Sequence, residues 1–150
     1  MTPFITAGGA FLFTILYADL MFDVQVLAHR GQEPPEHVLA SIAGYYRRVT
    51  VSARPLNRLV VVVMGATLAA IVVQLAGDDA PNWVGWTSLG LAGAPIVLAG
   101  VRTFPNAVRL ARRADPPDVQ TRIAWSICRD HLFCAVAITS LLVVQLVFAR

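Results

Sequence analysis

Four long apolar stretches, separated by shorter polar segments, dominate the pattern of this chain. They cover about residues 4–28, 59–76, 84–101 and 132–149. An α-helix needs roughly 20 mainly apolar residues to cross the hydrocarbon core of a bilayer, and each stretch comes close to that length. The pattern therefore predicts an all-α fold, an integral membrane four-helix bundle that forms one domain over residues 1–150.

Residues 36–53, before the second apolar stretch, follow a different pattern. Apolar side chains recur there at helical spacing, and Arg47 and Arg48 lie on the opposite, polar side. The apolar set is Val38, Leu39, Ile42, Tyr45, Tyr46 and Val49. This pattern predicts an amphipathic helix, lying on the membrane surface or extending the next span into the cytoplasm.

The first stretch has a cleaved signal peptide as its main alternative interpretation. It lacks a basic segment at its start, its apolar part is long, and two acids interrupt it, so we expect a retained helix. Gly8 and Gly9 are small enough to let a neighbouring helix approach closely.

Composition supports the membrane assignment. Hydrophobic residues make up 57% of the chain and charged residues only 14%, which argues against a disordered chain and against an ordinary soluble domain. The formal charge is +3, and all 12 basic residues are arginine. A basic excess can indicate nucleic acid, but these arginines lie between apolar stretches, so we expect no nucleic-acid partner. The lysine-free composition favours a bacterial source.

The distribution of arginine predicts the orientation. Every arginine except Arg150 lies in or beside the connection between the first two stretches or that between the last two. The middle connection has no arginine, only Asp78 and Asp79. Cytoplasmic loops carry the excess of arginine and lysine, so we expect a multi-pass protein of the inner (plasma) membrane with both termini outside.

Asp19 and Asp23 are the most informative polar residues. A carboxylate at the centre of a membrane helix costs roughly 2.5–3.5 kcal/mol on insertion scales, so both aspartates need partners. They lie four residues apart and share a helix face. The predicted topology puts them at the depth of Arg129, Asp130 and His131, and we expect Arg129 to face them.

Two interpretations of this constellation are open. The first is an ionic lock that joins the first and last helices. The second is a site, near the cytoplasmic end, that binds a small and largely apolar molecule and could oxidise or isomerise it. Asp19 or Asp23 would accept a proton, Arg129 would hold an oxyanion, and His131 would relay a proton. The remaining candidate binding residues are Tyr17, Asn57, Asn106, Trp125 and Asp130.

Other chemistries have weaker support. The types of residue that bind metals are present, but their spacing matches no metal motif, so we predict no metal site. These residues are Asp19, Asp23, His29, Asp130, His131 and Cys134. The three histidines lie near or beyond the ends of the spans, which disfavours heme, and the chain has no CxxC motif for thiol chemistry. The sequence identifies no cofactor.

Two further functions stay open beside the site. A proton-coupled transporter would use Asp19 or Asp23 as its titrating group and would need a polar path past Gln74. A non-catalytic subunit of a larger membrane complex would need only packing surfaces. The expected partners are the lipid bilayer, a small apolar ligand and further copies of the chain, since four short helices bury little surface on their own.

Asn106 after the third stretch, with Trp125 and Arg129 at the start of the fourth, resembles the anthrone-oxygenase-like family of small four-helix membrane proteins. The resemblance covers mainly residues 104–142. It implies a cofactor-free oxidation of an aromatic, polyketide-like substrate. The chain departs from the family pattern at Ile127 and Cys128, where a polar residue is usual, and Asp19 and Asp23 have no counterpart in it.

Overall fold

The computed structural model describes residues 1–52, 54–77 and 80–149, and of Arg54 only the backbone. All regular secondary structure in these ranges is helical. The end of the predicted amphipathic segment at Ala53, the acidic pair Asp78 and Asp79, and Arg150 lie outside the described residues.

Four helices are long and apolar enough to cross a membrane, by length and composition. Helix α1 covers Thr2–Asp23 and continues as a 3₁₀ segment, η1, over Val24–His29. Helix α3 covers Arg54–Ala76. Helix α4 (Asn82–Leu98) continues through η3 (Ala99–Thr103) into α5 (Phe104–Arg112), and α6 covers Pro117–Phe148. The four predicted stretches are therefore confirmed as helical; each helix begins before its predicted start, and α6 ends at Phe148, one residue before the predicted end.

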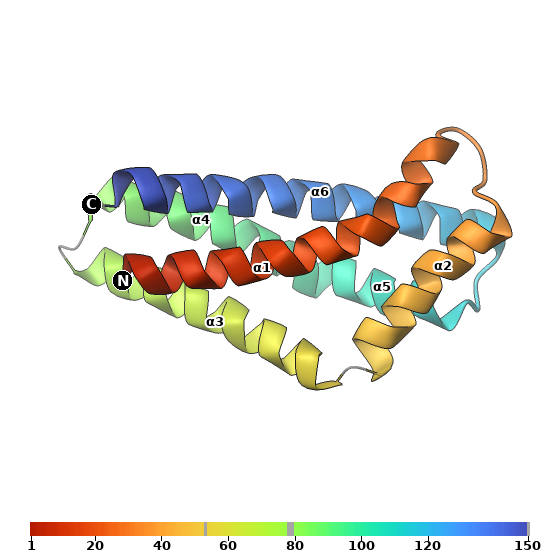
Figure 1. Ribbon diagram of the computed structural model, residues 1–150, viewed down its shortest axis with the longest axis horizontal. Helices are drawn as coiled ribbons and strands as arrows, with labels where there is room; N and C mark the ends of the chain where they lie inside the picture. Colours follow the sequence, from red (N-terminus) through yellow and green to blue (C-terminus); the bar gives the residue numbers. More distant parts are fainter. Residues whose placement is uncertain (53, 78–79, 150) are drawn as a thin grey trace.

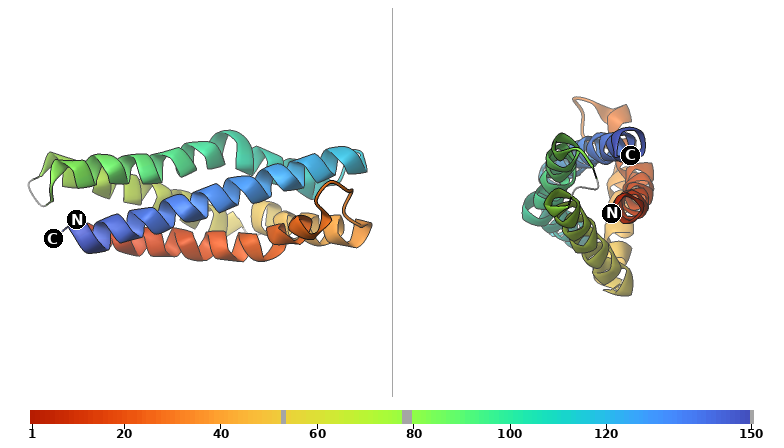
Figure 2. Two further views of the ribbon diagram at one scale, coloured as in Figure 1. Left: turned by 90° about the horizontal axis from the view of Figure 1, so that it is seen from above. Right: turned by 90° about the vertical axis from the view of Figure 1, so that its left-hand side faces the viewer.

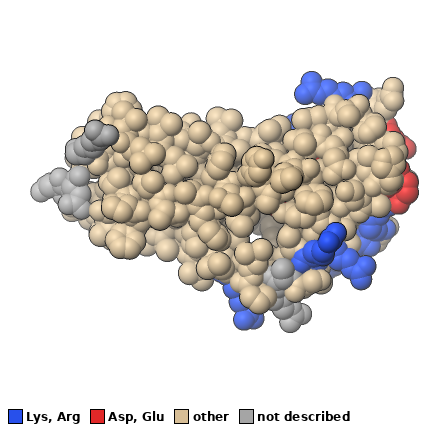
Figure 3. All heavy atoms as spheres, viewed as in Figure 1, with Lys and Arg blue, Asp and Glu red and all other residues tan. Residues whose placement is uncertain are grey.

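These helices pack side by side, with neighbours in the order α1, α3, α4 and α6, and α6 returns to α1. Both chain termini lie at one end of the bundle, which we call the terminal end (Figure 1). Helix α2 (Glu36–Tyr46) and the segment η2 (Arg47–Ser52) lie at the opposite end, beside α5. We call this the arginine end, because the arginines with described side chains gather there, as Figure 3 shows.

Proline explains where most helices begin. Proline has no backbone N–H, and the first turn of a helix leaves N–H groups without a partner in any case. Pro3, Pro105 and Pro117 each lie at the first or second position of a helix, and Pro35 and Pro81 come directly before one. Pro105 lies in the first turn of α5, and the helix continues through it.

Between α4 and α5 the chain stays helical, but its backbone hydrogen bonds change to the π-helical spacing. η3 is a π-helical turn, and η2 is a second one. π turns are rare and occur frequently at functional sites. The two π turns face the same region of the molecule, described below.

Buried apolar residues form two separate clusters. One lies at the arginine end, where α2, α5 and α6 meet, and includes Leu39, Ile42, Leu110 and Ile127. The other lies in the terminal half of the bundle and includes Ile5, Ile71 and Leu141. Helix α2 therefore buries its apolar side against the protein, so the interpretation as a surface-lying helix is corrected: α2 covers the arginine end of the bundle.

The outer surface of the four long helices is apolar. Phe4, Val61, Val97 and Val136, one on each helix, are 71%, 67%, 62% and 68% exposed. Such a large exposed apolar surface would be costly in water. On the face that Figure 3 shows, the described arginine and acidic side chains lie toward the arginine end.

Candidate functional site

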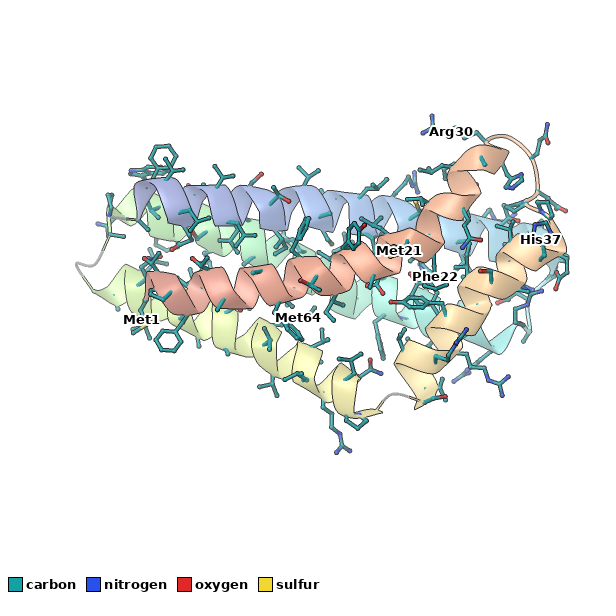
Figure 4. All side chains as sticks on the ribbon, in the orientation of Figure 1. Met1, Met21, Phe22, Arg30, His37 and Met64 are labelled. Atoms are coloured by element: carbon teal, nitrogen blue, oxygen red, sulfur yellow. The ribbon has the colours of Figure 1, made fainter. Side chains whose placement is uncertain are left out.

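Five polar side chains meet between the two apolar clusters. They are Asp19 and Asp23 on α1, Tyr45 and Tyr46 on α2, and His131 on α6. We call them the polar cluster. The i,i+4 spacing puts both aspartates on one face of α1, and α2 brings two adjacent tyrosines over that face. Phe22 fixes the position of Tyr45, whose ring stacks on it with 4.2 Å between centroids (Figure 4).

Asp23 is the fully buried member of the cluster, only 1% exposed. Its Oδ1 accepts a hydrogen bond of 2.7 Å from the Tyr46 hydroxyl, and its Oδ2 lies 2.6 Å from Nδ1 of His131. Since an ionised carboxylate can only accept, Nδ1 carries the proton in this arrangement. Asp23 therefore fixes the orientation of the imidazole and leaves Nε2 free for another partner.

Asp19 lies on the other side of the imidazole. Its Oδ1 accepts a hydrogen bond of 2.6 Å from the Tyr45 hydroxyl. Its Oδ2 lies 3.8 Å from Nε2 of His131, too far for a direct hydrogen bond. An oxygen atom between the two could lie about 2.8 Å from each, which is ordinary hydrogen-bonding distance.

The two tyrosines are held as proton donors. Burial raises the pKa of the Tyr45 phenol, and the nearby charge of Asp19 raises it further. Burial and the charge of Asp23 do the same to the pKa of the Tyr46 phenol. Both phenols therefore stay protonated, which keeps their hydrogen bonds to the aspartates intact.

Two cavities meet at Asp19 and His131. The larger, of about 190 Å³, lies toward α2 and is called the inner cavity; Tyr45, Tyr46 and Asn57 also line it. The smaller, of about 100 Å³, extends toward the middle of the bundle among Leu12, Met64 and Ile138 and is called the mid-bundle cavity. Both are mainly apolar, so Asp19 and His131 present two polar atoms to a space that suits an apolar molecule.

Both π turns contribute to the inner cavity. Val49 and Thr50 come from η2, and Ala99 and Thr103 come from η3. The carbonyl oxygen of Thr50 accepts a hydrogen bond of 3.0 Å from Asn57 Nδ2, which ties η2 to the start of α3. The irregular turns thus shape the wall of the cavity opposite the polar cluster.

Asp130 belongs to a separate interaction. It is buried, and its carboxylate accepts hydrogen bonds from the guanidinium of Arg102 and, at 3.1 Å, from the hydroxyl of Thr103. Arg102 and Thr103 both lie in η3, so Asp130 attaches this π turn to α6. The carboxylate of Asp130 is not among the described groups that line either cavity.

The pairing of the aspartates with Arg129 is not observed. Arg129 is exposed, and it forms no ion pair with Asp19 or Asp23 in the described part of the chain. Residues two positions apart on a helix point about 160° away from each other, so α6 turns His131 inward and Arg129 outward. Arg122, seven residues before Arg129 and so on the same side of α6, is also exposed and pairs with Asp118.

Of the other candidate binding residues, one lines a cavity and three do not. Asn57 lines the inner cavity as expected. Tyr17 is 61% exposed on the outside of α1, Trp125 packs against the apolar cluster at the arginine end, and Asn106 is half-buried. None of these last three is among the described residues that line the cavities.

Four participants were missed from the sequence: Tyr45, Tyr46, Arg102 and Thr103. The tyrosines had a signal, since both lie on the apolar side of the amphipathic segment. The pattern predicts a position on the membrane surface or on a cytoplasmic extension of the next span, because nothing in it shows that α2 folds back over the bundle. Arg102 was assigned only to the basic loop.

Among the described residues, no three histidine, cysteine or acidic side chains are grouped so that they could hold a metal ion. Cys128 and Cys134 are both buried free thiols.

The fold and the cluster define an all-helical bundle with a buried carboxylate, imidazole and phenol network at one end. Comparison with known proteins places it in no family: no family model, no curated protein and no solved structure matches the chain.

Proposed function

We propose that this chain is a multi-pass protein of a bacterial inner membrane, with the arginine end in the cytoplasm and both termini outside. The apolar outer surface of the four long helices and the one-sided distribution of arginine support this proposal. In this orientation the polar cluster lies within the membrane, near its cytoplasmic side.

The function that the geometry supports best is the binding of a small, largely apolar molecule that carries a hydroxyl or carbonyl group, with proton transfer on that group. One observation carries the proposal: Asp19 and His131, whose Oδ2 and Nε2 atoms lie 3.8 Å apart, both line two mainly apolar cavities. Ionisable groups inside a membrane are costly and are kept mainly where they serve a function.

Proton transfer would follow from the partners of the imidazole. In the state that carries a proton on Asp19 Oδ2, while Oδ1 still accepts from Tyr45, His131 Nε2 takes a proton from the carbon beside the carbonyl of the ligand and Asp19 donates its proton to the carbonyl oxygen, so that an enol forms. Where a C=C bond adjoins that carbon, the imidazolium returns its proton to the far end of the C=C bond and Asp19 takes back the enol O–H proton, which completes an isomerisation. Asp23, held by Tyr46, stabilises the imidazolium that forms in the first step.

Exchange of carbon-bound hydrogen tests this proposal without knowledge of the natural ligand. Cyclohexanone is incubated in deuterated buffer with the full chain in nanodiscs, and loss of its α-proton signal is followed by NMR. We expect faster exchange than with empty nanodiscs. His131→Gln should remove the gain, since a positioned base contributes typically a hundredfold or more. His37→Gln is the matched control, because His37 is exposed outside the bundle (Figure 4). No acceleration, or equal acceleration by His131→Gln, would refute the proposal.

The transporter alternative gains no support from the terminal half of the bundle. Gln74 and Gln145 donate amide hydrogen bonds to each other, and Gln145 also donates to Ser88. All three side chains are buried, so this layer joins α3, α4 and α6 instead of lining a polar path. Self-association of the chain and the oxidation implied by the anthrone-oxygenase-like resemblance stay predictions.

A further inference from the structure

A third hollow, which we call the lateral groove, lies between α3 and the α4–η3–α5 helix. It has a volume of about 460 Å³. Its lining includes Val61, Met64 and Gly65 on α3, with Ile96, Gly100 and Phe104 opposite. Asn57 is the only described polar side chain in its wall. Val61 is 67% exposed, so the groove borders the surface that lipid would cover.

The groove adjoins the inner cavity. The two share Asn57, Val60, Ala99 and Phe104 as lining residues. The groove and the mid-bundle cavity likewise share Val60, Met64, Ile96 and Ala99. The groove therefore adjoins both cavities that Asp19 and His131 line, which brings one end of an elongated molecule in the groove close to these two side chains.

The π turn η3 has small side chains where the groove meets the two cavities. It puts Ala99 at the shared wall and Gly100 in the groove itself. A β-carbon added at Gly65 or at Gly100 would meet no heavy atom within 4 Å. The space over both glycines is therefore open on the side where a chain would lie.

Charge restricts the head of the occupant. Asp19 lines the inner cavity, Asp23 lies directly behind His131, and among the described side chains no arginine lines that cavity. The chain contains no lysine. An anionic head, such as a phosphate or a carboxylate, would lie beside two acids in a poorly solvated space without a fixed cation, at high cost. A neutral hydroxyl or carbonyl has no such cost.

We propose that the lateral groove holds the apolar chain of a neutral lipid, a long-chain alcohol or ketone, whose head group reaches Asp19 and His131. The position of the head rests on the proposed function; the position of the chain rests on the groove itself. The substrate class is thus a neutral lipid that enters sideways from the bilayer, between α3 and α4.

Photolabelling locates the chain. The full-length protein is placed in phosphatidylcholine nanodiscs with a long-chain alcohol that carries a diazirine at mid-chain, and labelled peptides are identified by mass spectrometry. We expect labelling to concentrate on α3 near Met64 and on η3. Gly65→Leu fills the groove and should lower this labelling about tenfold, equivalent to roughly 1.4 kcal/mol of binding. Gly90→Leu is the matched control, because Gly90 is exposed on α4 outside the groove.

Competition tests the head group. Unlabelled dodecanol should suppress the labelling, and dodecanesulfonate, with the same chain and a fixed negative charge, should not. Equal competition by both would overturn the neutral-lipid assignment. If Gly65→Leu fails to fold, Val61→Trp blocks the same groove from the exposed side and should give the same loss.

Three results would overturn the proposal that the lateral groove holds a lipid chain. The first is equal labelling of Gly65→Leu and wild type, and the second is labelling spread over the outer faces of all four helices. The third is a groove that a second copy covers and the probe does not label. The ketone exchange experiment fails independently of these. Groove labelling without exchange would refute the head-group chemistry and leave the chain site in place. Exchange without groove labelling would refute the chain site and leave the head-group chemistry in place.

Discussion

Asp23 is the residue on which the polar cluster depends. Its two oxygens bind Tyr46 and His131, and it has almost no contact with solvent. A buried group that loses its partner retains the cost of burial without the compensating hydrogen bond. The consequences of replacing Asp23 therefore extend to side chains on two other helices.

Asp23→Ala should lower the free energy of unfolding by roughly 3–5 kcal/mol, because the change leaves His131 and Tyr46 buried without their acceptor. Asp118→Ala is the control. Asp118 also pairs with a cation, but Asp118 and Arg122 are both exposed, and such i,i+4 pairs contribute only about 0.3–0.5 kcal/mol. Thermal unfolding of both variants in one detergent checks the prediction; similar losses would show that the cluster is not the buried unit described here.

Two arginines near Asp130 should respond differently to the same change. Arg102→Gln removes the bidentate partner of the buried Asp130 carboxylate and should lower the free energy of unfolding by roughly 1–3 kcal/mol. Arg129→Gln removes an exposed side chain, so its free energy of unfolding should stay within about 0.5 kcal/mol of that of wild type. The double variant Arg102→Gln, Asp130→Asn should recover part of the loss, as chemical denaturation can measure. A larger effect of Arg129→Gln would favour the arrangement expected from the sequence.

At the scale of the helix, the predictable part was the existence of each element. A run of about 20 apolar residues favours a helix, the form that satisfies its own backbone hydrogen bonds, so the four long apolar helices followed from the pattern alone. The rotation of α6 about its own axis did not follow from the pattern. Its pattern allowed a buried face with Arg122, Trp125 and Arg129, but α6 instead buries Ile127, Cys128 and His131, which keeps two guanidinium groups in solvent.

The site was only half predictable for a related reason. Asp19, Asp23 and His131 were visible as polar residues in apolar runs, and their pairing balances a burial cost. Tyr45 and Tyr46 reach them only because α2 folds back over the end of the bundle. That placement depends on tertiary packing against α5 and α6, which no local pattern encodes. The π turns are likewise a product of packing.

The contact between α1 and α3 depends on Gly8. A β-carbon there would overlap the hydroxyl of Thr67 on α3. Gly8→Ala should therefore destabilise the bundle by roughly 1–3 kcal/mol, since Thr67 is buried and has little room to move. Gly90→Ala has open space and should be neutral or slightly stabilising. Equal unfolding temperatures of the two variants would contradict the close α1–α3 approach.

The whole molecule has an asymmetry of charge that predicts its orientation in a membrane. The arginine end carries the positive charge of two connections, and the opposite connection has no arginine. A reporter fused after Arg113 should behave as cytoplasmic, and one fused after Arg150 as external. The reverse pattern would place the polar cluster on the other side of the membrane, although it would leave the cavities unchanged.

The central claim is that Nε2 of His131 faces a space that a neutral apolar molecule enters. Nitrogen NMR of the protein with ¹⁵N-labelled histidine, in nanodiscs and titrated with cyclohexanol, tests it most directly. We predict a protonated Nδ1 held by Asp23, and a shift of the His131 Nε2 resonance on addition of the alcohol that Asp19→Asn weakens. The His37 resonances should not move. An Nε2 resonance of His131 that cyclohexanol leaves unchanged, or an Nδ1 without a proton, would contradict the account.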